Sequence, residues 1–227
     1  MLQYDEAPGS LVEAAYDRIR RDIIFGALPS GAKLRIDELR ERYGFGATPL
    51  REALSRLTAV GLVETASQRG FRVAPVSAKD LQDVTESRVR LETQLLAESI
   101  THGDDAWEGR VAGAFHTLTK MESEGLPLDA ETFSRWEERN SAFHDALIGA
   151  SVSAWTARFR ATIYDHHERY RRISHLVGNR SFDVRDEHAA ICEAALARDV
   201  ETATRLTAEH IRRTGEAIRI HLGPQLV

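Results

Sequence analysis

The spacing of apolar residues changes about one third of the way along the chain. Up to residue 76, three segments with helical spacing are followed by two short segments rich in β-branched and aromatic residues. From residue 77 onward, the apolar positions follow helical spacing alone. The pattern therefore predicts a small module of helices and strands, followed by a larger all-helical module.

The small module has the order of a winged helix-turn-helix. Helices are predicted over residues 10–25 and 36–43, and the second ends at Gly44, a residue type that tolerates the left-handed backbone of a C-cap. A third helix is predicted over residues 48–60, with Thr48 as its N-cap and the following proline as its first helical residue. Two short strands then form a hairpin, the wing, over residues 62–74.

The second part predicts six amphipathic helices joined by short connections, so neighbouring helices should pack antiparallel in a bundle. They are expected near residues 78–102, 104–123, 129–149, 152–178, 181–198 and 200–222. The predicted fold is thus mainly α, with an N-terminal winged helix-turn-helix over residues 1–76 and a C-terminal all-α six-helix antiparallel bundle over residues 77–227.

Composition places the chain among globular proteins of a reducing compartment. It has 227 residues, 42% of them hydrophobic, and a single cysteine, Cys192, which excludes an internal disulfide framework. No segment approaches the run of about 18 apolar residues that a membrane span needs, and the acidic start is unlike a signal peptide. We therefore expect a cytoplasmic protein without a membrane partner, with Cys192 as a small core residue.

The charge is divided unevenly between the two parts. The net charge of −5 by itself disfavours a nucleic-acid partner, yet eight basic and five acidic residues lie between Lys33 and Arg72. The excess of acidic residues belongs to the helical part. A mildly basic module attached to an acidic one remains compatible with binding to double-stranded DNA.

The third helix separates an apolar face from a polar one. Leu50, Ala53, Leu54 and Leu57 cluster on one side, whereas Arg51 and Ser55 share the other. A helix of this length fits the major groove, where an Arg can pair with guanine. The predicted DNA contacts are Arg35, Thr48, Arg51, Ser55, Arg69, Gly70 and Arg72. The alternative is that these are ordinary solvated charges.

Polar residues interrupt the apolar stripes of the second part. Arg88 lies among apolar neighbours, so it needs an anion. This anion could be internal, such as Glu92 or a carboxylate on another helix, or it could be the carboxylate of a bound ligand. The expected effector-binding residues are Arg88, Asn140, Tyr164 and Tyr170. The adjacent His166, His167 and Glu168 lack the spacing of a metal motif, so a solvated or pocket-rim role is expected for them.

Three histidines also lie on apolar stripes. His188 and His210 each lie 11 residues from Asp199, the turn between the last two helices, so an antiparallel hairpin would place them face to face. His144 has Asn140 one turn before it on the same side. Three imidazoles and an oxygen donor suit a divalent transition metal, above all Zn²⁺, with Ni²⁺ or Mn²⁺ as other candidates. A metal-free, hydrogen-bonded pocket is the alternative.

Several segments of the first part resemble the DNA-binding domain of GntR-family bacterial transcription regulators. They are Phe25-Gly26, Pro29 to Leu34, Thr48 to Leu57, Gly61 to Val63 and Gln68 to Val73. The resemblance implies a homodimer on a pseudo-palindromic operator. In that family the residues before the Thr-Pro usually read Val-Ser-Arg, and the Arg commonly touches DNA; here they are Phe45-Gly46-Ala47.

The second part resembles the FCD-type effector domain of the FadR branch of that family. The matching pieces are residues 88–92, 140–144 and 187–191 and His210. The wider pattern is most similar to the carbon-starvation-induced repressor group. In metal-containing relatives the position of Asn140 is usually Asp, and the three histidines are the other ligands. The resemblance thus implies a metal site at Asn140, His144, His188 and His210, weakened by a neutral ligand.

These features favour a ligand-responsive transcriptional regulator, expected to be a repressor, whose DNA affinity changes when a small organic acid binds, through the metal if one is present. The alternative is a metal-dependent helical-bundle enzyme that carries a DNA-binding-like module. The di-iron pattern of an enzyme of that kind is missing, because no histidine follows a Glu at a distance of three residues. A third reading is a DNA-binding module whose bundle only dimerises.

Overall fold

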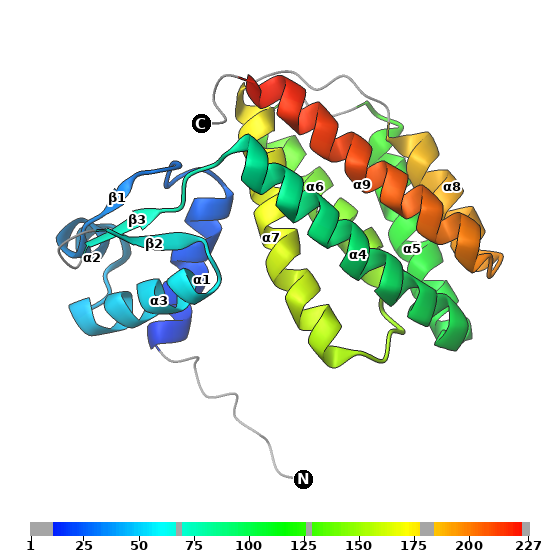
Figure 1. The fold of residues 1–227 in the computed structure, drawn as a ribbon, viewed down its shortest axis with the longest axis horizontal. Helices are drawn as coiled ribbons and strands as arrows, with labels where there is room; N and C mark the ends of the chain where they lie inside the picture. Colours follow the sequence, from blue (N-terminus) through cyan, green and yellow to red (C-terminus); the bar gives the residue numbers. More distant parts are fainter. Residues whose placement is uncertain (1–10, 67–69, 126–128, 178–183, 224–227) are drawn as a thin grey trace, which may run out of the picture. The chain divides into compact units, whose positions relative to one another are not determined.

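The computed structural model describes residues 11–66, 70–125, 129–177 and 184–223. The chain forms two compact units that divide between Ser77 and Ala78 (Figure 1). Each unit is described by itself below.

The first unit contains three helices and a small antiparallel sheet within its described residues. In chain order the elements are α1 (Leu11–Ile24), β1 (Lys33–Leu34), α2 (Ile36–Tyr43), α3 (Ala47–Ala59), β2 (Val63–Ala66) and β3 (Gly70–Val73). The strand order is β1-β3-β2, and β3 pairs antiparallel with both neighbours. The sequence did not predict β1, because a two-residue strand is too short to show alternation. The winged helix-turn-helix is confirmed.

The core of this unit forms between α1 and α3. The four apolar residues predicted for the inner face of α3, Leu50, Ala53, Leu54 and Leu57, are fully buried. They belong to one cluster with Ile19 and Ile23 of α1. Burial of this stripe leaves Arg51 and Ser55 exposed on the opposite face.

The predicted N-cap of the third helix is wrong by two residues. α3 begins at Ala47 with Gly46 as its N-cap, so Thr48 is inside the helix, and no side chain caps this end. Pro49 is therefore the third helical residue, where its missing N–H still removes one of the four donors that have no intrahelical acceptor. At the preceding turn, Gly44 has a φ of 74°, as its predicted C-cap role requires.

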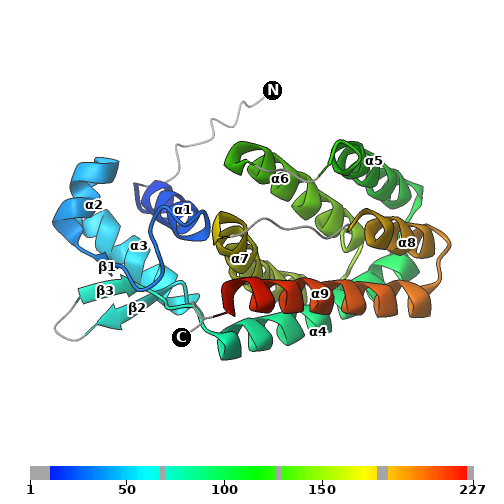
Figure 2. The ribbon, with the colours of Figure 1, turned by 90° about the horizontal axis from the view of Figure 1, so that it is seen from above.

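The second unit is all-helical over its described residues. Its elements are α4 (Ala78–His102), α5 (Asp105–Glu122), α6 (Ala130–Leu147), α7 (Ala154–Val177), α8 (Arg185–Leu196) and α9 (Val200–Leu222). The six predicted helices are confirmed, with ends displaced by a few residues at most within the described ranges; the predicted helical residues 178 and 181–183 lie outside the described residues. Helix α4 packs on α7 and α9, α5 packs on α6 and α8, and α8 packs on α9 (Figure 2). No helix in the described ranges combines the length and apolar character of a membrane span.

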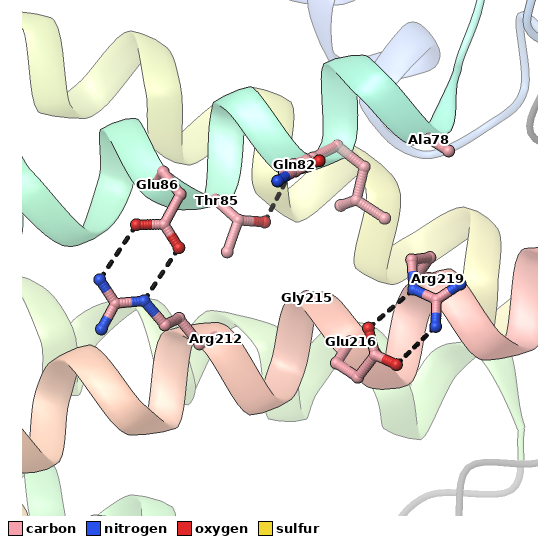
Figure 3. Close-up of a pocket in the computed structure, with 9 residues that line it drawn as sticks. Ala78, Gln82, Thr85, Glu86, Arg212, Gly215, Glu216 and Arg219 are labelled. Atoms are coloured by element: carbon pink, nitrogen blue, oxygen red, sulfur yellow. Dashed lines mark hydrogen bonds and ion pairs between the residues drawn. The ribbon is translucent and has the colours of Figure 1, made fainter.

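A glycine allows α4 and α9 to approach closely. A Cβ atom added to Gly215 would lie 2.7 Å from Oγ1 of Thr85, which is closer than real Cβ contacts (Figure 3). The neighbouring core joins α5, α6 and α8, and it includes Cys192, which is 3% exposed. This burial confirms the prediction that Cys192 is a small core residue.

Candidate functional site

Three buried histidines meet inside the second unit. His144 of α6, His188 of α8 and His210 of α9 each offer one ring nitrogen, and these nitrogens lie within 4.8 Å of one another. Asp199 caps α9 by accepting the Thr202 N–H, and this tight turn sets α8 and α9 side by side. The rings of His188 and His210 therefore face each other, with centroids 4.8 Å apart. The spacing around Asp199 had predicted this arrangement.

Carboxylates behind two of the rings determine which nitrogen carries the proton. His188 Nδ1 lies 2.9 Å from Glu122 Oε1, and His210 Nδ1 lies 2.7 Å from Glu187 Oε2. Since a carboxylate only accepts, both Nδ1 atoms donate, and each Nε2 keeps its lone pair. Within the described residues, Nε2 of His188 has no hydrogen-bond partner, and neither ring nitrogen of His144 has one. Lone pairs at the meeting point of these rings are available to a metal ion.

Burial keeps the imidazoles of His144 and His210 neutral. It lowers the pKa of His144 well below its usual value and lowers the pKa of His210 to about 4, in each case against the opposing effect of a nearby carboxylate. A metal ligand must be the neutral imidazole, so the environment favours coordination at neutral pH. Outer carboxylates on ligand histidines are typical of zinc sites. Three imidazoles fit Zn²⁺, whose tetrahedral coordination takes a fourth ligand.

The sequence did not predict that carboxylates lie behind these histidines; it indicated Glu92 only as a partner of Arg88. Glu122 ends α5 and lies 66 positions before His188, and its Oε1 also accepts from Nε1 of Trp136 at 3.2 Å. Glu187 directly precedes His188 but serves His210. Glu92 Oε2 lies 3.5 Å from Nδ1 of His144. The sequence shows that these helices carry acidic residues. Which histidine each acid contacts depends on how the helices pack.

Asn140 lies one turn before His144 on α6 and is 3% exposed. Its Nδ2 donates to Glu137 Oε1 at 3.1 Å and lies 3.4 Å from the hydroxyl of Tyr164. Of the four residues predicted to hold the metal, the structure brings the three histidines together. Asn140 shares α6 with His144 alone, and its amide contacts Glu137 and Tyr164.

Arginines surround Tyr164. The guanidinium carbons of Arg88, Arg160 and Arg171 lie 4.7, 4.2 and 5.0 Å from the centroid of its ring. Arg88 donates to Glu92 at 2.9 Å, so the internal ion pair, the first of the two readings for Arg88, is present. Arg160 donates to the same Glu92 oxygen at 3.0 Å.

Two buried carboxylates balance these cations. Burial would raise the pKa of Glu92, but Arg88 and Arg160 outweigh it and hold that pKa well below its usual value. For Glu137, Arg171 likewise overcomes burial and lowers the pKa. Both carboxylates are therefore ionised at neutral pH. Tyr170, the other tyrosine predicted at the effector site, donates its hydroxyl to Asp80 in the first turn of α4.

The prediction of a solvated or rim position for His167 is wrong. Its side chain is fully buried, and Nδ1 lies 3.1 Å from Nη1 of Arg88 and 2.8 Å from Nη1 of Arg171. Arginine only donates, so this Nδ1 is an acceptor and the ring is neutral, with its proton on Nε2. The adjacent position, His166, is only half-buried. Three consecutive polar residues do not show from sequence alone which of them α7 buries.

The residues predicted to contact DNA that the structure describes are exposed or partly exposed in the first unit, and some of them form ion pairs. Thr48, Arg51 and Ser55 are exposed on α3, with Thr48 in its first turn. Arg35 forms an exposed ion pair with Glu38 at 3.2 Å. In the wing, Arg72 is held across the strands by Glu64 at 2.6 Å, and Gly70 begins β3. Arg69 lies outside the described residues.

A separate groove of about 370 Å³ lies between α4 and α9 (Figure 3). Thr85 and Gly215 form its floor, and an ion pair between Arg212 and Glu86 crosses one end. None of the histidines or the arginines around Tyr164 lines it. It is therefore distinct from the buried cluster.

Comparison with known families matches both units. Residues 11–73 match the bacterial regulatory proteins of the gntR family, and residues 83–213 match the FCD domain. The chain belongs to the GntR family and carries an FCD domain. This membership confirms the resemblance seen in the sequence. Proteins of this family are transcriptional regulators, so the alternative of a metal-dependent enzyme is set aside.

Relatives extend along nearly the whole chain. The HTH-type transcriptional regulator BphR of Paraburkholderia xenovorans is 40% identical over 92% of this chain and 86% of its own length. The HTH-type transcriptional repressor GlaR of Escherichia coli is 34% identical over 86% of this chain and 90% of its own length. The structure of E. coli McbR/YncC has the same fold, with a TM-score of 0.77 over 94% of this chain and 99% of that one, at 21% identity. The chain is thus similar to transcriptional regulators of this kind along most of its length.

Proposed function

We propose that this regulator is a repressor that acts as a homodimer in the bacterial cytoplasm and releases operator DNA when a small carboxylate binds. Residues 1–76 bind the operator through Arg35, Thr48, Arg51, Ser55, Arg69, Gly70 and Arg72. Residues 77–227 dimerise and bind the effector. The repressor assignment is supported by the similarity to GlaR, which is named a repressor.

The observation that carries the sensing role is the set of three buried imidazoles, two of which turn Nδ1 toward a carboxylate. We assign His144, His188, His210 and Asn140 to a divalent transition metal, with Zn²⁺ preferred over Ni²⁺ or Mn²⁺. Burying three histidines without such a ligand leaves polar ring nitrogens unsatisfied, which is costly in a protein interior. Within the bound site, the metal would supply a cationic centre that attracts carboxylates.

The effector binds beside this centre, near Arg88, Asn140, Tyr164 and Tyr170. Arg88 is held by Glu92, and a ligand carboxylate can compete for the same bidentate guanidinium. Replacing Glu92 by a ligand carboxylate changes the forces on α4, the helix that carries Arg88. Helix α4 begins five positions after the last residue of β3, so it directly follows the wing in the chain. Because binding is reciprocal, an effector that weakens DNA binding must itself bind the DNA complex less well.

Metal binding is tested by removing the metal with a chelator and titrating Zn²⁺ against a chromogenic competitor. We expect one ion per chain and loss of binding in His188→Ala. The matched control is His116→Ala, since His116 is exposed on α5. Equal binding by wild type and His188→Ala would contradict the site.

Effector response is tested on an operator selected from random duplexes by the wild-type protein. Fluorescence anisotropy would then measure DNA affinity with and without succinate, glutarate, citrate or lactate. We expect at least one acid to weaken DNA binding, and we expect Arg88→Ala to lose that response. Arg90→Ala, an exposed neighbour on α4, is the control. Unchanged affinity across the acids would remove the effector claim.

A further inference from the structure

The orientation of the Asn140 amide decides whether this residue can bind a metal. Its Oδ1 has lone pairs for a cation, whereas its Nδ2 carries two hydrogens and cannot coordinate. Asn140 is buried, so the choice between the two ends depends on its protein neighbours rather than on water. The question is what fixes that choice.

Glu137 is the neighbour that fixes the orientation of the Asn140 amide. Its carboxylate is 1% exposed and receives Nε of Arg171 at 3.0 and 2.9 Å and Nη2 at 2.7 Å. Such a multiple contact with a guanidinium marks an ionised carboxylate, which has acceptor atoms only. The Asn140 atom 3.1 Å from Glu137 Oε1 must therefore be the donor Nδ2.

We propose that Glu137, held by Arg171, is a positioning residue that turns the Asn140 amide so that Oδ1 faces the histidine cluster. Glu137 also places a negative charge directly behind this neutral ligand. The inference rests on the proposed metal site and adds a reason for the amide. A single aspartate would supply both a negative charge and a ligand oxygen. Here Glu137 supplies the charge and Asn140 supplies the oxygen.

The same geometry explains why an amide suits position 140. A carboxylate there would lie within hydrogen-bond distance of Glu137 with no hydrogen between the two groups, and like charges in a buried site repel strongly. The Asn140 amide instead donates a hydrogen bond to the Glu137 carboxylate. Glu137 and Asn140 therefore depend on each other, and changing both together is the informative experiment.

The experiment compares Zn²⁺ affinity in wild type, Glu137→Gln, Asn140→Asp and the double variant, by competition with a chromogenic chelator. Glu137→Gln removes the charge and lets either end of the Asn140 amide face residue 137, so Zn²⁺ affinity should fall about 10–100-fold. The control is Glu138→Gln, an exposed neighbour that should keep wild-type affinity.

The double variant should recover the affinity lost in Glu137→Gln. Both oxygens of an aspartate can coordinate, so orientation no longer matters, and the charge returns to the site. The glutamine amide introduced at position 137 can still accept from Arg171 and can donate to the new carboxylate. We also expect thermal unfolding of the metal-free proteins to show a lower midpoint for Asn140→Asp, raised again in the double variant.

The possible failures are distinct. If the wild-type protein binds no Zn²⁺, Ni²⁺ or Mn²⁺, the proposed metal site is wrong and this inference goes with it. If the wild type binds Zn²⁺ and Glu137→Gln binds it equally well, the metal site stands and the inference is overturned. Weak binding by Glu137→Gln that the second substitution does not restore also overturns it, because Glu137 would then act through the fold alone.

Discussion

At the scale of single residues, proton placement distinguishes the buried histidines. His188 and His210 donate from Nδ1 to carboxylates, which leaves Nε2 as the basic atom. His167 does the reverse, because two arginines donate to its Nδ1. The first arrangement prepares a ring for a metal ion, whereas the second ties Arg88 of α4 to Arg171 of α7. Burial alone therefore does not make a histidine a ligand.

Acid should destabilise the metal-free protein. The folded-state pKa of His210 is lowered to about 4, so between its unfolded value near 6.5 and that value the unfolded chain binds a proton that the folded chain does not. Stability is lost as the pH falls through this window, by about 2 kcal/mol between pH 7 and pH 5 for His210 alone. Urea unfolding at the two pH values measures it, and His210→Gln should reduce the difference. A stability independent of pH would contradict the prediction.

The single thiol should be unreactive in the folded protein. Burial raises the pKa of Cys192 to about 11, so little thiolate exists at about pH 8, and the residue is 3% exposed. Ellman's reagent should label one thiol per chain in denaturant and almost none under native conditions. Rapid labelling of the native protein would show that the core around α8 opens readily.

At the scale of elements, amphipathic spacing predicted the helices well, because each buries one continuous stripe. The ends were harder. The left-handed φ of Gly44 could be predicted from a glycine at the end of a helical segment. The start of α3 could not, because its N-cap, Gly46, has no side chain that would mark it as a cap. The pairing of β1 with β3 joins residues far apart in sequence and leaves no local signal. Local rules therefore predict the interior of an element better than its boundary.

The turn between α2 and α3 should tolerate asparagine better than valine. Gly44 has a φ of 74°, and an added Cβ would meet no atom within 4 Å among the described residues, so a substitution costs backbone strain alone. We expect Gly44→Val to lower the free energy of unfolding by about 1–2 kcal/mol and Gly44→Asn by less, since asparagine visits this region more readily. Chemical denaturation of the three proteins tests the order. Equal losses would show that φ is not the cause.

At the scale of the whole molecule, sequence found the histidines but not the network behind them. Symmetry about Asp199 places His188 opposite His210, which is a local property of one helical hairpin. The partnership of Glu122 with His188 spans 66 positions and depends on how α5 packs on α8. His167 shows the same limit, since its burial follows from contacts with α4. Contacts between residues far apart in sequence depend on helix packing, which the spacing of residues along one helix does not predict.

DNA recognition should depend on the exposed face of α3. Replacing Arg51, which is exposed there, with Ala should weaken binding to the selected operator by about 1–3 kcal/mol if Arg51 pairs with guanine. Arg205→Ala is the control, because Arg205 is exposed in the second unit and pairs with Glu209. Anisotropy titrations on the operator and on a base-substituted duplex measure both affinity and specificity. A uniform loss on every duplex would point to phosphate contact instead.

The shared oxygen of Glu122 gives the protein an optical signal. Glu122 Oε1 accepts from His188 Nδ1 and from the indole Nε1 of Trp136, so an electronic change at the imidazole reaches a chromophore through one carboxylate. Trp136 is 5% exposed, whereas Trp155 is 67% exposed. A water-borne quencher such as iodide silences the emission of Trp155 and leaves that of Trp136 and of Trp107, the other buried indole. We therefore expect the intrinsic fluorescence that remains after quenching to change with the state of the histidine cluster, without any attached dye.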